Sequence, residues 1–151
     1  MRYQFQSNPG QLSYRPSLFT DAIKILISIN FGIFVLQSIS SSEIIFFSIF
    51  GLIPKMVWSE LKIWQPITYM FFHGDIWHVL INMFVLWMFG SELERVWGKR
   101  NFLRFYFITG IGSGLVTMFF GLQSMIPIVG ASGAVYGVLS AYGLTYPNRT
   151  V

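Results

Sequence analysis

The sequence contains no cysteine, and few of its residues are charged. Without cysteine the chain cannot form disulfides, thiolate zinc sites or a cysteine nucleophile, so serine, histidine, asparagine and carboxylates remain as candidates for chemistry. Charged residues make up 11% of the 151 positions, whereas a soluble domain carries roughly 25%. That is too little polar surface to cover a chain that is 54% hydrophobic and 19% aromatic. The composition therefore predicts a membrane protein in contact with the lipid bilayer.

The scarce charges exclude one class of partner and indicate a topology. Ten Lys and Arg against six Asp and Glu give a formal net charge of +4. This density is too low for a surface that follows nucleic-acid phosphates, so we expect no nucleic-acid partner. Basic residues that flank apolar segments instead mark the cytoplasmic side of a membrane protein.

Hydropathy predicts an all-α fold, a polytopic transmembrane helix bundle with four spans in this chain. Apolar residues dominate four segments whose lengths approach the roughly 20 residues needed to cross a bilayer. The spans are placed near residues 22–39, 73–90, 102–122 and 132–146. Residues 21–151 would then form a partial membrane domain, preceded by a polar cytoplasmic tail at residues 1–20.

The segment between the first two spans is unusual. Its apolar run before Pro54 is only about ten residues long, which is too short to cross the membrane. Trp58 and Trp64 follow, and Trp rings favour the level of the lipid headgroups. Residues 43–65 are therefore predicted to form a partly embedded loop. The charged stretch after residue 90 is predicted to be an ordinary loop that ends the second span.

Lys and Arg residues divide unequally between the two sides of these spans. Counting loop by loop predicts a cytoplasmic N-terminus and an outer loop at 43–65. We expect the membrane to be the plasma membrane of a bacterium. Eight basic residues lie on the inner side: Arg2, Arg15, Lys24, Arg95, Lys99, Arg100, Arg104 and Arg149. The outer side has only Lys55 and Lys62.

Ser132 is the first candidate for chemistry. The fourth span is short, so its first turn is expected to lie below the outer surface, at Gly130-Ala131-Ser132-Gly133-Ala134. Small residues allow a sharp bend into a helix, and the helix N-terminus would stabilise an oxyanion formed at the serine. Two interpretations stay open from this segment alone: a nucleophile, or a serine that caps a glycine-rich packing helix.

Three polar residues of the second span also draw attention. Polar side chains inside a span are costly and are functional candidates for that reason. His78 and Asn82 are four residues apart, share a helix face and could donate hydrogen bonds to an oxyanion near Ser132, although they could also tie two helices together. A metal site is not expected, because His73 and His78 do not share a face and no intramembrane carboxylate accompanies them.

The order of these residues resembles the rhomboid family of intramembrane serine proteases. The resemblance covers about Trp64 to Pro147 and rests on His73-x4-His78-x3-Asn82, Glu94-x3-Gly98, and Gly130-Ala131-Ser132-Gly133-Ala134 with Tyr136 and Gly137. It implies that Ser132 is the nucleophile, that His78 and Asn82 form the oxyanion hole with the Ser132 N–H, and that Tyr136 packs beside the catalytic histidine. Gly130, Gly133, His73 and Glu94 would have supporting roles. The implied reaction is cleavage of single-span membrane proteins in or near the bilayer, without a cofactor.

The sequence departs from the family pattern at two places. Trp64 is followed by Gln65, where the family often has Arg, which leaves the internal hydrogen bonding of the loop open. The family's general base is a histidine of a sixth span, and neither histidine of this chain matches it. We therefore expect the reading frame to continue beyond Val151 and the 151-residue chain alone to be inactive. The main alternative is a non-catalytic rhomboid-like scaffold that binds client helices. A transporter or channel is less favoured, because all six acids fall near span ends or in loops.

Overall fold

The computed structural model describes residues 18–40 and 42–148, and over these residues the fold is helical. The only strand-like feature in these ranges is an isolated antiparallel bridge between Leu52 and Ile128. The prediction of an all-α membrane bundle is thus confirmed. All but the last three residues of the predicted tail at 1–20 lie outside the described residues. The elements are α1 (Asp21–Ile39), α2 (Glu43–Phe50), α3 (Pro54–Ser59), α4 (Gln65–Thr68), the 3₁₀ turn η1 (Tyr69–Phe71), α5 (Ile76–Val85), the π-helical turn η2 (Leu86–Gly90), α6 (Ser91–Trp97), α7 (Lys99–Phe120) and α8 (Ser132–Thr145).

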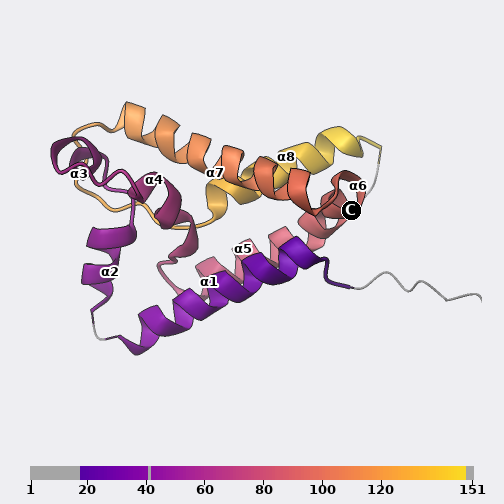
Figure 1. Cartoon of the computed structure of the whole chain (residues 1–151), viewed down its shortest axis with the longest axis horizontal. Coiled ribbons are helices and arrows are strands. Elements are labelled where there is room, and N and C mark those ends of the chain that lie inside the picture. Colours follow the sequence, from indigo (N-terminus) through magenta and orange to yellow (C-terminus); the bar gives the residue numbers. More distant parts are fainter. Residues whose placement is uncertain (1–17, 41, 149–151) are drawn as a thin grey trace, which may run out of the picture.

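Among the described residues, three helical stretches are long and apolar enough to cross a membrane: Asp21–Ile39, Ile76–Trp97 and Lys99–Phe120. Helix α8 has 14 residues. At 1.5 Å per residue it extends about 21 Å, less than the roughly 30 Å thickness of the hydrocarbon core. Figure 1 shows α2, α3 and α4 gathered at one end of the molecule and α6 at the other, with α1 and α7 running between the two ends.

The second of these stretches differs from its predicted form. It continues past residue 90 through α6, so the charged segment that we expected as a loop is helical up to Trp97. Glu, Leu and Arg are good helix formers, which explains why charge alone did not end the helix. The break comes at Gly98, whose φ of 77° is readily adopted only by glycine.

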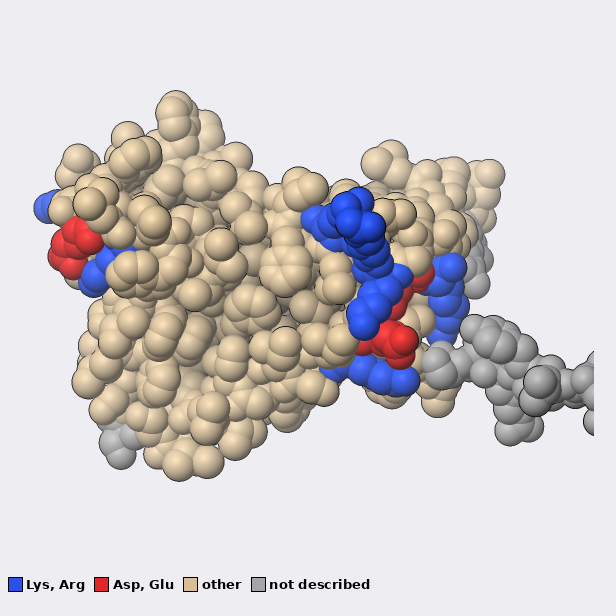
Figure 2. Space-filling model, in the orientation of Figure 1, with Lys and Arg blue, Asp and Glu red and all other residues tan. Residues whose placement is uncertain are grey.

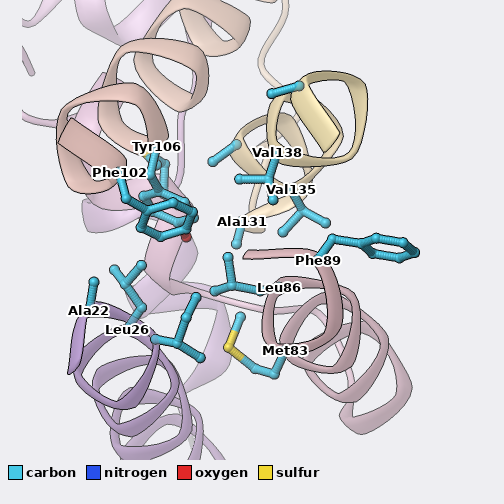
Figure 3. Packing of buried hydrophobic residues seen from close by; sticks show 14 of the residues in the cluster. Ala22, Leu26, Met83, Leu86, Phe89, Phe102, Tyr106, Ala131, Val135 and Val138 are labelled. Atoms are coloured by element: carbon cyan, nitrogen blue, oxygen red, sulfur yellow. The ribbon is translucent and has the colours of Figure 1, made fainter. Parts of the chain in front are cut away.

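The core is formed where the helices meet. Figure 3 shows side chains from α1, η2, α7 and α8 pointing toward a common centre, among them Leu26, Leu86, Phe102 and Val138. Helices α7 and α8 approach closely, because a Cβ atom at Gly137 would lie 2.6 Å from the Thr109 Cβ. Helix α8 is therefore held tightly against α7, which fixes the position of its first residue, Ser132.

Gln65 organises the segment between α2 and α4. Its side chain is fully buried. Its Oε1 atom accepts a hydrogen bond from the Ile53 N–H at 3.0 Å, and its Nε2 atom donates to the Ser48 carbonyl at 3.1 Å. Arginine carries donors only and could not accept from Ile53, whereas an amide does both. The sequence left the bonding around Gln65 open, and the structure shows that Gln65 joins α2 to the segment before α3.

Candidate functional site

A cavity of about 280 Å³ lies between α5 and α8. Four residues singled out from the sequence line it, His78 and Asn82 from α5 and Ser132 and Tyr136 from α8. Its remaining lining is apolar: Ile81, Val85, Val135 and Leu139. The structure therefore brings a serine hydroxyl, an imidazole and an amide together in a largely apolar pocket, where hydrogen bonds are stronger than in water.

Ser132 is the first residue of α8 and follows a strained turn. Gly130 has a φ of 122°, which side-chain-bearing residues rarely adopt. A Cβ atom at Gly130 would lie 2.7 Å from Nε2 of His78 and 3.7 Å from Oγ of Ser132. The imidazole and the hydroxyl therefore flank the same point of the backbone. Only glycine satisfies both the conformation and the space at this position.

The segment before Ser132 is held by hydrogen bonds from residues 52–73. Ile128 and Leu52 exchange two backbone hydrogen bonds of 2.9 Å each. The Gly130 N–H donates to the carbonyl of Tyr69 at 2.9 Å. The Ala131 N–H then donates to Nε2 of His73 at 3.4 Å. Successive residues of the turn are thus fixed by a segment far away in the sequence.

His78 and Asn82 are positioned by local hydrogen bonds of α5. Asp75 caps the helix, because its Oδ1 atom accepts from the His78 N–H at 2.9 Å. Asn82 is almost completely buried, and its Nδ2 atom donates to the His78 carbonyl, one turn earlier, at 2.9 Å. An amide nitrogen has two hydrogens, so this bond leaves one donor of Asn82 available.

The candidate nucleophile has no base bonded to it in the part of the chain that the structure describes. Within residues 18–40 and 42–148, no hydrogen bond joins the Ser132 hydroxyl to His73 or His78. The two imidazole rings stand edge to face, with centroids 5.0 Å apart. Over the same residues, no group of three or more His, Asp or Glu side chains could hold a metal ion.

Glu94 lies away from the cavity. It is buried in α6 and accepts hydrogen bonds from three groups at the start of α1. These are the Thr20 hydroxyl, the Ala22 N–H at 2.9 Å and the Ile23 N–H at 3.2 Å. A carboxylate at this place satisfies N–H groups that have no partner within their own helix. Glu94 thus caps α1 from a different helix.

The other predicted supporting residues occupy different places. Tyr136 is 70% exposed at the rim of the cavity. Gly133 faces α7, where a Cβ atom would lie 2.5 Å from Oγ of Ser113. His73 is completely buried behind the cavity lining. Gly133 therefore serves the contact between α7 and α8.

Sequence reasoning missed Gln37, whose Nε2 atom donates to the His73 carbonyl at 2.6 Å. It is 1% exposed and lies within the first predicted span. The rule that singled out His78 and Asn82, that a polar residue in a span is a candidate, applies equally to Gln37. The contribution of Tyr69 left no such signal, because it comes from a backbone carbonyl.

Comparisons with known proteins agree on one family. The Rhomboid domain model matches residues 60–150. The chain is 33% identical over 85 residues to Rhomboid protein 1, mitochondrial, from Saccharomyces cerevisiae, covering 54% of this chain and 25% of that protein. It is 33% identical over 92 residues to the Rhomboid protease GluP from Bacillus subtilis, covering 61% of this chain and 18% of that protein.

A longer match is to Rhomboid-like protein 11, chloroplastic, from Arabidopsis thaliana, which is 28% identical over 138 residues, 91% of this chain and 46% of that protein. The chain spans less than half the length of each of these relatives. The family model covers more than half of the chain and includes the candidate site. The chain is an integral membrane protein that belongs to the rhomboid family.

Proposed function

We propose that the protein expressed from the whole reading frame is an intramembrane serine protease that cleaves single-span membrane proteins in or near the bilayer. The observation that carries this proposal is the cavity shared by Ser132, His78 and Asn82 at the start of α8. The name of the relative from Bacillus subtilis, Rhomboid protease GluP, supports the reaction class. Tyr136 at the rim of the same cavity would contact the substrate or the histidine base.

In the proposed reaction, Oγ of Ser132 attacks the carbonyl carbon of the scissile peptide bond and loses its proton to a base. The carbonyl oxygen becomes an oxyanion, which the side chains of His78 and Asn82 and the Ser132 N–H would stabilise by hydrogen bonds. Collapse of this intermediate breaks the C–N bond, and the amine leaves with a proton from the protonated base. Water then hydrolyses the acyl-enzyme and releases Ser132.

We assign the base to a histidine outside these 151 residues. His73 cannot serve, because its Nε2 atom already accepts from the Ala131 N–H and its ring is buried behind the cavity lining. His78 lies beside Gly130, where it would stabilise the oxyanion, and no hydrogen bond joins it to Ser132 in the described part of the chain. The 151-residue chain alone should therefore be inactive.

A fluorophosphonate probe, which reacts with activated serines, tests this function on the full-length protein. We expect the probe to label Ser132, as located by mass spectrometry, and to block cleavage of a single-span model substrate. His78→Ala and Asn82→Ala should each lower the labelling rate and the turnover by roughly 10²- to 10³-fold, the usual loss for one oxyanion donor.

Asn101→Ala is the matched control for these variants. Asn101 donates to the Trp97 carbonyl one turn earlier at 3.0 Å, as Asn82 does to His78, but it lies on the exposed surface of α7. Asn101→Ala should label at the wild-type rate. Stable His78 and Asn82 variants with wild-type turnover would refute the oxyanion role. Absence of serine labelling in membranes that contain the folded full-length protein would instead favour a non-catalytic scaffold that binds client helices.

We also propose that α1 begins at the cytoplasmic face of a plasma membrane. Figure 2 shows charged residues gathered at the two ends of the visible face, with an uncharged band between them. The described basic residues near α6 are more numerous than those near α3: Lys24, Arg95, Lys99, Arg100 and Arg104 against Lys55 and Lys62. An excess of basic residues marks the cytoplasmic side.

Single-cysteine variants test this orientation, since the natural chain has no cysteine. In intact cells, a membrane-impermeant maleimide should label Lys55→Cys in α3 and leave Lys99→Cys at the start of α7 unlabelled until the membrane is opened. Labelling of Lys99→Cys alone in intact cells would reverse the proposed topology.

A further inference from the structure

Helix α1 carries two completely or almost completely buried amide side chains, Asn30 and Gln37. They are seven residues apart and thus lie on the same face of the helix. Their bonds differ, however. Asn30 donates through Nδ2 to the Leu26 carbonyl of its own helix at 2.8 Å. Gln37 donates through Nε2 to the His73 carbonyl at 2.6 Å, which lies outside α1.

His73 in turn contacts both components of the candidate site. Its Nε2 atom accepts from the Ala131 N–H at 3.4 Å, one residue before Ser132. Its ring stands edge to face against that of His78, with centroids 5.0 Å apart. A buried backbone N–H without a partner destabilises a fold. By accepting from the Ala131 N–H, the Nε2 atom of His73 therefore stabilises the observed conformation of the turn.

The bond to Ala131 uses Nε2 of His73 as its acceptor. An imidazole nitrogen can accept only without a hydrogen, so this bond requires the neutral form of the ring. The Ala131 N–H belongs to the peptide group that joins Gly130 to Ala131. The ring of His73 therefore holds the strained glycine turn on one side and the ring of His78 on the other.

We propose that Gln37 and His73 are positioning residues which form a relay from α1 to the turn before Ser132. This inference rests on the proposed protease function. Gln37 fixes the backbone of His73, and His73 fixes the turn and the imidazole of His78. Displacement of reacting groups by about 1 Å can lower a rate 10²-fold, so loss of either residue should act on the chemical step more than on substrate binding.

The relay is tested with Gln37→Leu and His73→Phe in the full-length protein, reconstituted in liposomes with a single-span substrate. Both variants should lower kcat per folded molecule by roughly 10- to 100-fold and leave KM nearly unchanged. Asn30→Leu is the matched control, because it removes a buried amide from the same face without a contact to His73, and its kcat should match the wild type. His73→Gln keeps an acceptor at the reach of Nε2 and should restore most of the kcat lost in His73→Phe.

Hydrogen exchange at residues 128–133, followed by mass spectrometry, separates the relay from the reaction. Gln37→Leu and His73→Phe should speed exchange in this peptide, whereas Asn30→Leu and His73→Gln should not. Equal kcat and equal exchange in Gln37→Leu and Asn30→Leu would overturn the relay. Exchange in His73→Phe as slow as in the wild type would also overturn the relay. If His73→Phe fails to fold, the kcat and exchange rates of Gln37→Leu and His73→Gln test the relay instead. Cleavage that survives Ser132→Ala would reject Ser132 as the nucleophile of the proposed function, while the exchange rates would still show whether Gln37 and His73 hold the turn.

Discussion

Ser132→Ala is expected to abolish cleavage of a single-span substrate by the full-length protein and to leave its expression and fold intact. Loss of the nucleophile of a serine protease lowers kcat by about 10⁶-fold, because the acyl-enzyme can no longer form. The fold should tolerate the change, since it removes one hydroxyl from a half-buried residue at the start of α8. No hydrogen bond of that hydroxyl to a described residue would be lost.

Ser140→Ala provides the control for this variant. Ser140 lies two turns further along α8 and is exposed, so it shares the helix but lines no part of the cavity. Both variants should show the melting temperature of the wild type in detergent, and only Ser140→Ala should cleave the substrate in liposomes. Turnover by Ser132→Ala above the background of empty liposomes would remove Ser132 from the mechanism.

The fold was predictable where hydropathy and length determine it. The apolar segments that became α1, α5 and α7 carry a strong local signal, and their helical character follows from the need to satisfy backbone groups in lipid. The end of the second stretch was not predictable from charge, because Glu94 and Arg95 are good helix formers and the break depends on the positive φ of Gly98. A charged residue therefore predicts where the chain leaves the hydrocarbon core better than it predicts where a helix ends.

The pairing of His78 with Asn82 was predictable from spacing and residue type. His78 and Asn82 share a face because they are four residues apart, and their polarity inside an apolar segment indicates the interior. Their meeting with Ser132 required the family resemblance, since no local rule brings α5 and α8 together. The position of the Gly130 turn against His78 is visible only in the structure.

The supports of the site could not be predicted, because they join distant segments through backbone atoms. Gly130 is held by the carbonyl of Tyr69 and Ile128 by Leu52, and a backbone group leaves no mark in the sequence. Gln65 is a side chain whose position was identified from the sequence but whose hydrogen-bond partners were not. The resemblance identified the position as a departure, whereas the reason an amide suits it lies in the Ile53 N–H and the carbonyl of Ser48.

Glu94→Ala is expected to give the largest loss of stability of any variant considered. The carboxylate accepts from the Thr20 hydroxyl, the Ala22 N–H and the Ile23 N–H, and no water replaces it readily, because Glu94 is 5% exposed. Hydrogen bonds to a charged group contribute about 1.5–3 kcal/mol each, and buried donors left without a partner add a further cost. We expect the free energy of unfolding to fall by about 3 kcal/mol or more, measured by denaturation with SDS in mixed micelles.

Asp21→Ala separates this cap from a general effect of charge at the helix end. Asp21 is also an acid at the start of α1, but its side chain is 76% exposed and forms a 3.8 Å pair with Lys24. An exposed pair of this kind contributes less than about 1 kcal/mol, so the free energy of unfolding of Asp21→Ala should be close to that of the wild type. Glu94→Gln keeps one acceptor oxygen and replaces the other with an NH₂ donor that faces N–H groups. Its loss of unfolding free energy should therefore lie between those of Glu94→Ala and Asp21→Ala. If Glu94→Ala and Asp21→Ala lose the same stability, the Glu94 carboxylate acts only through the helix dipole. The hydrogen bonds that it accepts from the start of α1 would then not hold α1 and α6 together.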